Sequence, residues 1–267
     1  MSVRDQPRGA RRIVRRRGSW RDLPVFIVVS GVAAAACEPG PLDVITLEPS
    51  ALVYQLLAHY TFDEGSGTTV VDHSGNKRDG RLTNGTWIAD GRFGGALRLS
   101  GSDFVTVDNF PDAGPSFTVA AWVRTQAAPQ DGYETIVSTE IAFQGGWEIN
   151  LDKVSGGIGT HAAFWDSVDQ AYRRFECLCG VAGIWTHVVA VVDGGAATLS
   201  VYVNGVLESH TPAPHPISPG SAALFIGRWS QVKSRLLVGD VDDIAIYGRA
   251  LGPTEIGALE QHPPPDP

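Results

Sequence analysis

Short runs of alternating residues constrain this chain more than any other feature of its sequence. From residue 56 onward, apolar residues recur at every second position, and glycine-rich turns separate the runs. The run FTVAAWVRT, for example, puts Phe117 and Val119 on one face and Trp122 with Arg124 on the other. A period of two is typical of β-strands that bury one face. The chain is therefore predicted to fold mainly from strands.

The turns between these runs favour antiparallel pairing. WTHVVAVVDGGAATLSVYVNGVLE contains one tight turn at 193–195 and a second at Asn204-Gly205, a dipeptide that suits the positive φ angles of hairpin turns. Only GPTEIGALEQ has a helical pattern, with Pro253 in its first turn. About a dozen strands without alternating helices predict one all-β domain, a two-sheet antiparallel sandwich with one short C-terminal helix.

The N-terminal 37 residues have the composition of an export signal. Eight arginines precede the uncharged stretch LPVFIVVSGVAAAAC, which is shorter than the roughly 20 residues that a membrane span requires. A basic region, an apolar region and small residues before a boundary are typical of a secretory signal. The sequence Ala34-Ala35-Ala36-Cys37 resembles the lipobox of bacterial lipoproteins, which implies a lipid on Cys37. Ordinary cleavage after Ala36, or a basic tail with a buried apolar segment, are the alternatives.

The charge of the remaining chain excludes one class of partner. Residues 1–37 hold 8 of the 21 basic and 2 of the 29 acidic residues, which leaves 13 basic against 27 acidic, a net charge of about −14. Such a body repels nucleic acid, and we predict membrane contact only through the lipid anchor. Residues 38–55, rich in proline, are predicted to be a linker, and 262–267 (HPPPDP) a disordered tail.

Six motifs in fixed order resemble the laminin-G-like, concanavalin A-like domains. They lie between residues 56 and 261 and read AHYTFDEGSGTTVVDHSGNKRDGRL, FGGALRLSG, FTVAAWVRT, WTHVVAVVD, LSVYVNGVLE and DVDDIAIYGRALGPTEI. The resemblance implies a jelly roll of two curved antiparallel sheets. It also implies binding of sugars, proteins or other surface ligands, often beside calcium, while some relatives in the wider superfamily are glycoside hydrolases.

One strand carries an incomplete version of a hydrolase motif. Glycoside hydrolysis requires two facing carboxylates, and GWEINLDK offers Glu148 and Asp152 with Asn150 where the β-glucanase branch has an acid. The three side chains share one face of a strand. We predict a protein without catalytic activity and keep a glycoside hydrolase-like enzyme as the alternative.

Acidic residues at two places suggest a structural calcium ion. The turn DHSGN offers Asp72 and Asn76 as oxygen ligands, and the resemblance implies that this turn lies near the last strand. Asp242 or Asp243 then closes the site, only one of them because neighbours on a strand point to opposite faces. Asp63 is a further candidate. The alternatives are an Asx-type turn at Asp72 and a hydrogen-bonded or solvated rim residue at Asp242.

Aromatic residues beside loops are the predicted ligand contacts. Sugars stack on flat rings, and Trp165, Tyr172, Tyr133 and Trp229 all lie near turn residues. A protein partner would use the same side chains. We therefore predict an exported, surface-anchored binding module for a polysaccharide, a surface glycan or a surface protein. A structural adhesion or envelope protein that binds another protein is a further alternative.

The remaining two cysteines are two residues apart, at Cys177 and Cys179. In an exported protein such a pair favours a disulfide, although Cα atoms two apart on a strand lie at the limit for a bridge. Two reduced, partly buried thiols are the alternative.

Overall fold

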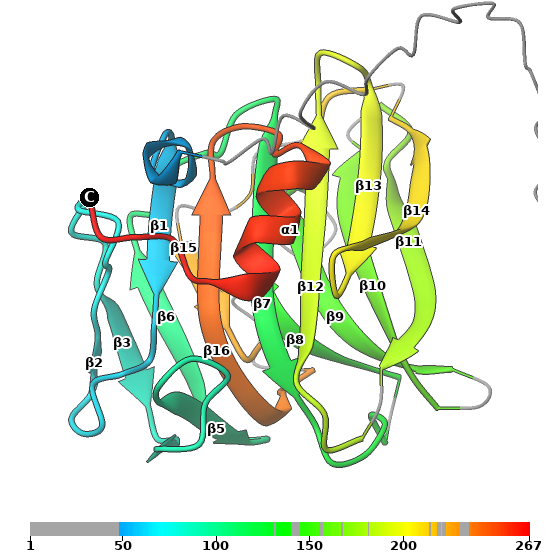
Figure 1. Ribbon diagram of the computed structural model, residues 1–267. Helices are drawn as coiled ribbons and strands as arrows, with labels where there is room; N and C mark the ends of the chain where they lie inside the picture. The colour runs from blue at the N-terminus through cyan, green and yellow to red at the C-terminus, as the bar shows by residue number, and fades with distance from the viewer. Residues whose placement is uncertain are drawn as a thin grey trace, which may run out of the picture. The chain divides into compact units, whose positions relative to one another are not determined.

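Two antiparallel β-sheets, packed face to face, make up the fold (Figure 1). The computed structural model describes residues 48–130, 132–139, 145–154, 157–166, 168–180, 182–213, 215–217, 220, 223–229 and 235–267, without the side chains of residues 49, 175, 176, 178 and 179. Residues 1–47, with the predicted signal and Cys37, lie outside this part. No helix in the described ranges is both long and apolar enough to cross a membrane.

Each sheet has eight strands in the described part of the chain. The first sheet runs in the order β14 (Val206–Pro212), β13 (Thr198–Val203), β12 (Thr186–Asp193), β7 (Phe117–Arg124), β16 (Val238–Tyr247), β5 (Ala96–Ser100) and β4 (Thr86–Ile88), with β1 (Leu56–Tyr60) also paired to β16. The second runs β11 (Ala171–Gly180), β10 (Gly157–Asp166), β9 (Trp147–Val154), β8 (Tyr133–Ser138), β15 (Ala223–Ile226), β6 (Phe104–Asp108), β3 (Gly80–Thr83) and β2 (Thr69–Val70). The prediction of an all-β, two-sheet antiparallel sandwich with one short C-terminal helix is confirmed.

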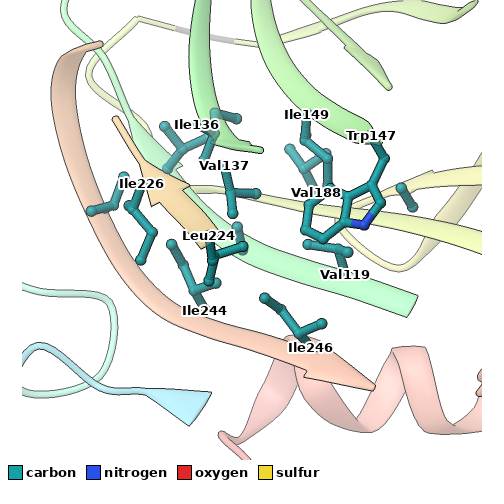
Figure 2. Packing of buried hydrophobic residues seen from close by; sticks show 14 of the residues in the cluster. Val119, Ile136, Val137, Trp147, Ile149, Val188, Leu224, Ile226, Ile244 and Ile246 are labelled. Carbon is teal, nitrogen blue, oxygen red and sulfur yellow. The ribbon is translucent and has the colours of Figure 1, made fainter. Parts of the chain in front are cut away.

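Alternate residues of the strands fill the space between the sheets. Figure 2 shows Val119 and Ile246 of the first sheet facing Ile149 and Leu224 of the second, with Trp147 among them. All five side chains are buried. Because side chains alternate along a strand, the neighbours of these residues point away from the core, and each sheet has an outer face.

The outer face of the first sheet is covered by α1 (Pro253–Gln261), as Figure 1 shows. Ile256 and Leu259 of the helix are buried in a second apolar cluster. The sheet supplies Ala120, Val189, Val191, Tyr202, Ala245 and Tyr247 to that cluster. The helix begins favourably, since the carboxylate of Glu255 accepts the backbone N–H of Gly252 at 2.9 Å.

Both ends of the described chain pack more closely than the sequence suggested. The segment predicted as a linker to residue 55 contains a 3₁₀ helix, η1 (Pro49–Leu52), and Leu52 is buried. Arg249 donates to the carbonyl of Ala51. In the predicted disordered tail, Pro264 is buried, and His73 Nδ1 lies 3.5 Å from Asp266 Oδ1. A proline-rich segment has little conformational entropy to lose, and that favours such packing.

Candidate functional site

The outer face of the second sheet carries polar side chains where the first sheet carries apolar ones. On β9, Trp147, Ile149 and Leu151 belong to the core. The residues between them, beginning with Glu148 and Asn150, therefore point to the outer face. The sequence analysis placed Glu148, Asn150 and Asp152 on one face, and the strand β9 gives them that arrangement.

Strand register brings predicted ligand contacts onto the same face. Tyr133 of β8 lies opposite Asp152, and Thr135 lies opposite Asn150. On β10, His161 lies opposite Asn150. Farther along β10, Trp165 follows a core residue and pairs with Tyr172 of β11, so these two also face outward.

We define the outer-face site as these residues together with three from neighbouring segments. Its members are Tyr133, Thr135, Glu148, Asn150, Asp152, His161, Trp165, Tyr172, Arg174, Trp229 and Arg235.

Arg235 connects several parts of this site. Its Nη1 lies 3.2 and 3.3 Å from the two carboxylate oxygens of Glu148. Its guanidinium lies 4.1 Å from the ring centre of Trp229 and 5.0 Å from that of Tyr133. Its backbone has a φ of 51° and its carbonyl accepts the N–H of Thr135 at 2.8 Å. A left-handed, non-glycine backbone costs free energy and is typical of functional positions.

His161 lies at the bottom of the site and is fully buried. Its Nε2 is 2.8 Å from Asn150 Nδ2, which must be the donor, so the proton of the neutral ring is on Nδ1. Nδ1 lies 3.4 Å from Asp152 Oδ2, longer than a good hydrogen bond. Burial, and after it the positive charges of Arg174 and Arg235, lower the pKa of His161 to about 3. The ring is therefore neutral at physiological pH.

Two acceptor atoms beside His161 have no protein partner. Asn150 Oδ1 and Thr135 Oγ1 are buried, and neither forms a hydrogen bond with the described residues. A buried polar atom without a partner costs about 1–3 kcal/mol, and most such atoms in proteins are satisfied. The site therefore offers hydrogen-bonding capacity that folding does not use.

The four aromatic residues predicted as ligand contacts differ in how far their rings are exposed to solvent. Trp165 and Tyr172 are partly exposed and pack edge to face, with ring centres 5.0 Å apart. Tyr133 is partly exposed, but guanidinium groups of Arg174 and Arg235 lie within 5.0 Å of its ring centre. Trp229 is only 7% exposed. It lies against Arg235, so it supports that side chain and does not offer a free ring face.

The sequence analysis missed His161, Arg174, Arg235 and Thr135. A signal existed for His161, because β9 and β10 are consecutive strands whose antiparallel pairing puts His161 opposite Asn150. Arg235 carried no such signal, since 87 positions separate it from Glu148.

The predicted calcium ligands divide into two separate places. Asp72 accepts backbone N–H groups from His59 and Ser74 at Oδ1 and from Arg78 at Oδ2. Burial acts to raise the pKa of Asp72, but these hydrogen bonds outweigh it and hold the pKa below its usual value. Asn76 donates to backbone carbonyls at the start of β1. The bond from Ser74 is the Asx-type turn that was the alternative at Asp72.

The other two carboxylates both hold the loop before β5. Asp242 Oδ2 accepts the N–H groups of Arg92 and Phe93 at 2.7 and 2.9 Å, and Asp63 Oδ1 accepts that of Gly95 at 2.6 Å. Asp242 and Asp243 are both buried, and Asp243 Oδ1 lies 2.6 Å from Nε2 of His59, whose backbone N–H donates to Asp72. That only one of the two closes a site with Asp72 stays a prediction.

These four residues do not fit one calcium ion in the described part of the chain. Three acidic or histidine side chains approach closely enough for an ion only at Asp166, Asp169 and His215, among the residues described. Arg173 donates to both of those carboxylates, which supplies the positive charge there. Calcium binding stays a prediction.

Cys177 is disulfide-bonded. The side chain of Cys179 lies outside the described residues, so the predicted pairing of the two stays a prediction.

Comparison with known proteins identifies the family and the fold. A family model described as the concanavalin A-like lectin/glucanases superfamily matches residues 99–257. Comparison with curated protein sequences gave no match.

Solved binding domains share the fold at low sequence identity. The botulinum neurotoxin serotype D binding domain is 14% identical with a TM-score of 0.63, over 79% of this chain and 52% of that one. The binding domain of Paraclostridial Mosquitocidal Protein 1 is 16% identical with a TM-score of 0.62, over 78% and 52%. Domain 4 of AbnA, a GH43 extracellular arabinanase from Geobacillus stearothermophilus solved with arabinotriose, is 23% identical with a TM-score of 0.59, over 78% and 98%. The chain thus spans about half the length of the two toxin binding domains.

Proposed function

Since the chain belongs to the concanavalin A-like lectin/glucanase superfamily, we propose that it is a non-catalytic module that binds carbohydrate on the outer face of its second sheet. The solved structures that share its fold include two binding domains and domain 4 of an arabinanase, which was solved in complex with arabinotriose. At these identities the likeness concerns the fold, so the residues of this chain have to carry the functional argument.

The observation that carries the proposal is the pair of unused acceptors in the outer-face site. Asn150 Oδ1 and Thr135 Oγ1 are buried without a protein partner. The partly exposed pair Trp165 and Tyr172 lies on the same face. Because both atoms are closed to solvent, binding has to displace the side chains that cover them. Hydroxyl groups of a sugar then satisfy the acceptors while its apolar ring face packs on the aromatic pair. Planar polar groups beside aromatic rings suit a carbohydrate better than a purely apolar ligand.

A glycoside hydrolase is the second candidate, because Glu148 and Asp152 share this face. Two features favour binding over catalysis. Asn150 stands between them where the hydrolase motif has an acid. The carboxylate of Glu148 is paired with Arg235, which stabilises the charged form and opposes a role as general acid. A surface protein as ligand is the third candidate.

The setting of this function follows from the N-terminal sequence alone. A basic region followed by an apolar stretch that ends at Cys37 supports export and a lipid anchor at the cell envelope. Calcium belongs to the proposal only as a structural ion to be tested, without assigned ligands, because Asp72 and Asp242 bind different segments of the chain.

The test compares two substitutions of the same chemistry on opposite faces of one sheet. Thr135→Val removes an unpaired hydroxyl from the outer face, and Thr160→Val removes an unpaired hydroxyl beside the core residue Leu151. Neither should lower stability, because neither hydroxyl has a partner to lose. Binding of the full chain to a panel of polysaccharides and cell-wall fragments is measured in calcium and in chelator.

We expect Thr135→Val to weaken binding about tenfold and Thr160→Val to leave it unchanged. Equal affinity of both variants and the wild type would move the ligand away from this face. Release of new reducing ends from a bound polysaccharide, abolished by Glu148→Gln, would support the hydrolase instead. Loss of binding in chelator would support calcium.

A further inference from the structure

Three arginines lie at or beside the outer-face site of this acidic domain, together with the carboxylates of Glu148 and Asp152. Beyond residue 37 the chain has 13 basic and 27 acidic residues, from 21 − 8 and 29 − 2. Three of those basic residues, Arg174, Arg228 and Arg235, lie at or beside this site. The domain as a whole repels anions, so a local cluster of guanidinium groups calls for a specific reason.

Two of these arginines reach the same aromatic ring from different elements. Arg174 of β11 lies 4.3 Å from the ring centre of Tyr133, and Arg235, from the segment before β16, lies 5.0 Å from it. Arg174 is exposed and Arg235 is about one-quarter exposed. Both groups can therefore contact a ligand that approaches Tyr133 from solvent.

Arg235 keeps donors available although it is paired with Glu148. Both contacts with that carboxylate come from Nη1. Within the described residues, no hydrogen bond involves Nε or Nη2 of Arg235. A guanidinium has five N–H donors in a planar fork, which suits two-point binding of a carboxylate or sulfate.

The guanidinium of Arg228 adds to the positive electrostatic potential beside the site. Arg228 is buried, and its guanidinium lies 4.1 and 4.4 Å from the ring centres of Phe225 and Phe104. Its carbonyl accepts the hydroxyl of Ser138, which lies opposite Glu148 on β9. Burial lowers the pKa of Arg228. The neutral His161 ring is consistent with a positive environment, since its low pKa owes part of its shift to Arg174 and Arg235.

We propose that the outer-face site takes an acidic glycan, with a carboxylate or sulfate group of the sugar held between Arg174 and Arg235 beside Tyr133. This inference rests on the proposed carbohydrate-binding function and specifies its ligand class. The guanidinium groups bind the charged group of the glycan, and its neutral hydroxyl groups bind Asn150 Oδ1 and Thr135 Oγ1 once the side chains over these buried atoms move. An exposed arginine also makes the affinity depend on ionic strength, because salt screens charges at the surface.

The experiment uses two pairs of polymers that differ only in charge. Binding of the full chain is measured to polygalacturonate and its methyl ester, and to dextran sulfate and dextran, at low and high salt. We expect an acidic polymer to bind about tenfold more tightly than its neutral partner, with affinity falling as salt rises. Which pair responds tells a carboxylate from a sulfate.

Substitution of one exposed arginine tests whether this site binds the charged group of the polymer. Arg174→Gln should weaken binding of the acidic polymer about tenfold and leave the neutral one unchanged. Arg81→Gln is the matched control, because Arg81 is also exposed on a strand of the second sheet and its loss changes the net charge equally. Arg235→Lys keeps a positive charge beside Glu148 and should reduce the preference for the acidic polymer without unfolding the chain.

The outcomes separate this inference from the proposed function. Equal binding of acidic and neutral polymers, still weakened by Thr135→Val, overturns the acidic-ligand inference and leaves the carbohydrate-binding function standing. Equal weakening by Arg174→Gln and Arg81→Gln overturns it as well, since net charge alone would then act. Absence of binding to all four polymers and to the wider panel overturns both.

Discussion

The outer faces of the two sheets have the same geometry and opposite chemistry. The outward positions of the first sheet include Ala120, Val189 and Ala245, which α1 covers with Ile256 and Leu259. The corresponding positions of the second sheet hold Glu148, Asn150, His161 and Arg174. Covering an apolar outer face with the chain's own helix removes that face from water and stabilises the folded state. A face with unpaired acceptors and arginines is stabilised more by a polar ligand than by an apolar helix.

The largest loss of stability is expected from a substitution on the face that α1 covers. Ile256→Ala removes a fully buried side chain from between α1 and the first sheet, and large-to-small substitutions of this kind cost about 2–5 kcal/mol. Chemical denaturation should show a loss of stability in this range, and affinity for the glycan should not change. A loss of affinity in the folded protein would mean that the two faces are coupled.

A pH dependence should come from the edge of the same face. Asp242 lies opposite Trp122, and burial raises the pKa of Asp242 to about 7. The folded-state pKa lies above the usual value of 3.8, so this group's contribution to stability is present below about pH 4 and is lost as the pH rises through 7. The expected loss is about 4 kcal/mol.

Asp242→Asn tests this while other titrations cancel. The free energy of unfolding of the variant minus that of the wild type should rise between pH 5 and pH 8. His161 and His187 act in the opposite direction, because burial lowers the pKa of each to about 3 and their contribution is lost as the pH falls below about 6.5. A difference that stays constant with pH would exclude a raised pKa at Asp242.

The ion pair between Glu148 and Arg235 on the polar face should contribute less to the stability of the fold. Glu148→Gln removes the charge that Arg235 contacts, and we expect a loss of about 2 kcal/mol because a partly buried guanidinium is left without its partner. The double variant Glu148→Gln with Arg235→Gln should recover part of the loss. Additive losses in a double-mutant cycle would show that the pair does not stabilise the fold.

The smallest loss of stability is expected for a substitution in the aromatic pair, which should still weaken ligand binding clearly. Trp165→Ala removes one ring of the partly exposed pair with Tyr172, and we expect about tenfold weaker glycan binding with a small change in melting temperature. Tyr54→Ala is the control, since Tyr54 is 64% exposed and precedes β1 of the first sheet. Equal affinity of the wild type and Trp165→Ala would remove the aromatic pair from the ligand contacts.

Much of the site was accessible from the sequence because alternation is a local property. Each residue on a strand points opposite to its neighbours, so Glu148, Asn150 and Asp152 had to share a face before any partner strand was known. The same rule separated the core residue Trp147 from the outward ones. Tyr133, Trp165 and Tyr172 are aromatic residues near turns in the sequence, and they lie on that face.

The strands, their two faces and the short helix follow from the local sequence, since these depend on residues a few positions apart. Which faces meet follows from the folded chain, because register and coverage depend on contacts between distant segments. It brought Arg235 to Glu148, buried Trp229 beneath that arginine, and separated Asp72 from Asp242. No pattern within a single strand contains those distances, and so the chemistry of the site emerged only with the fold.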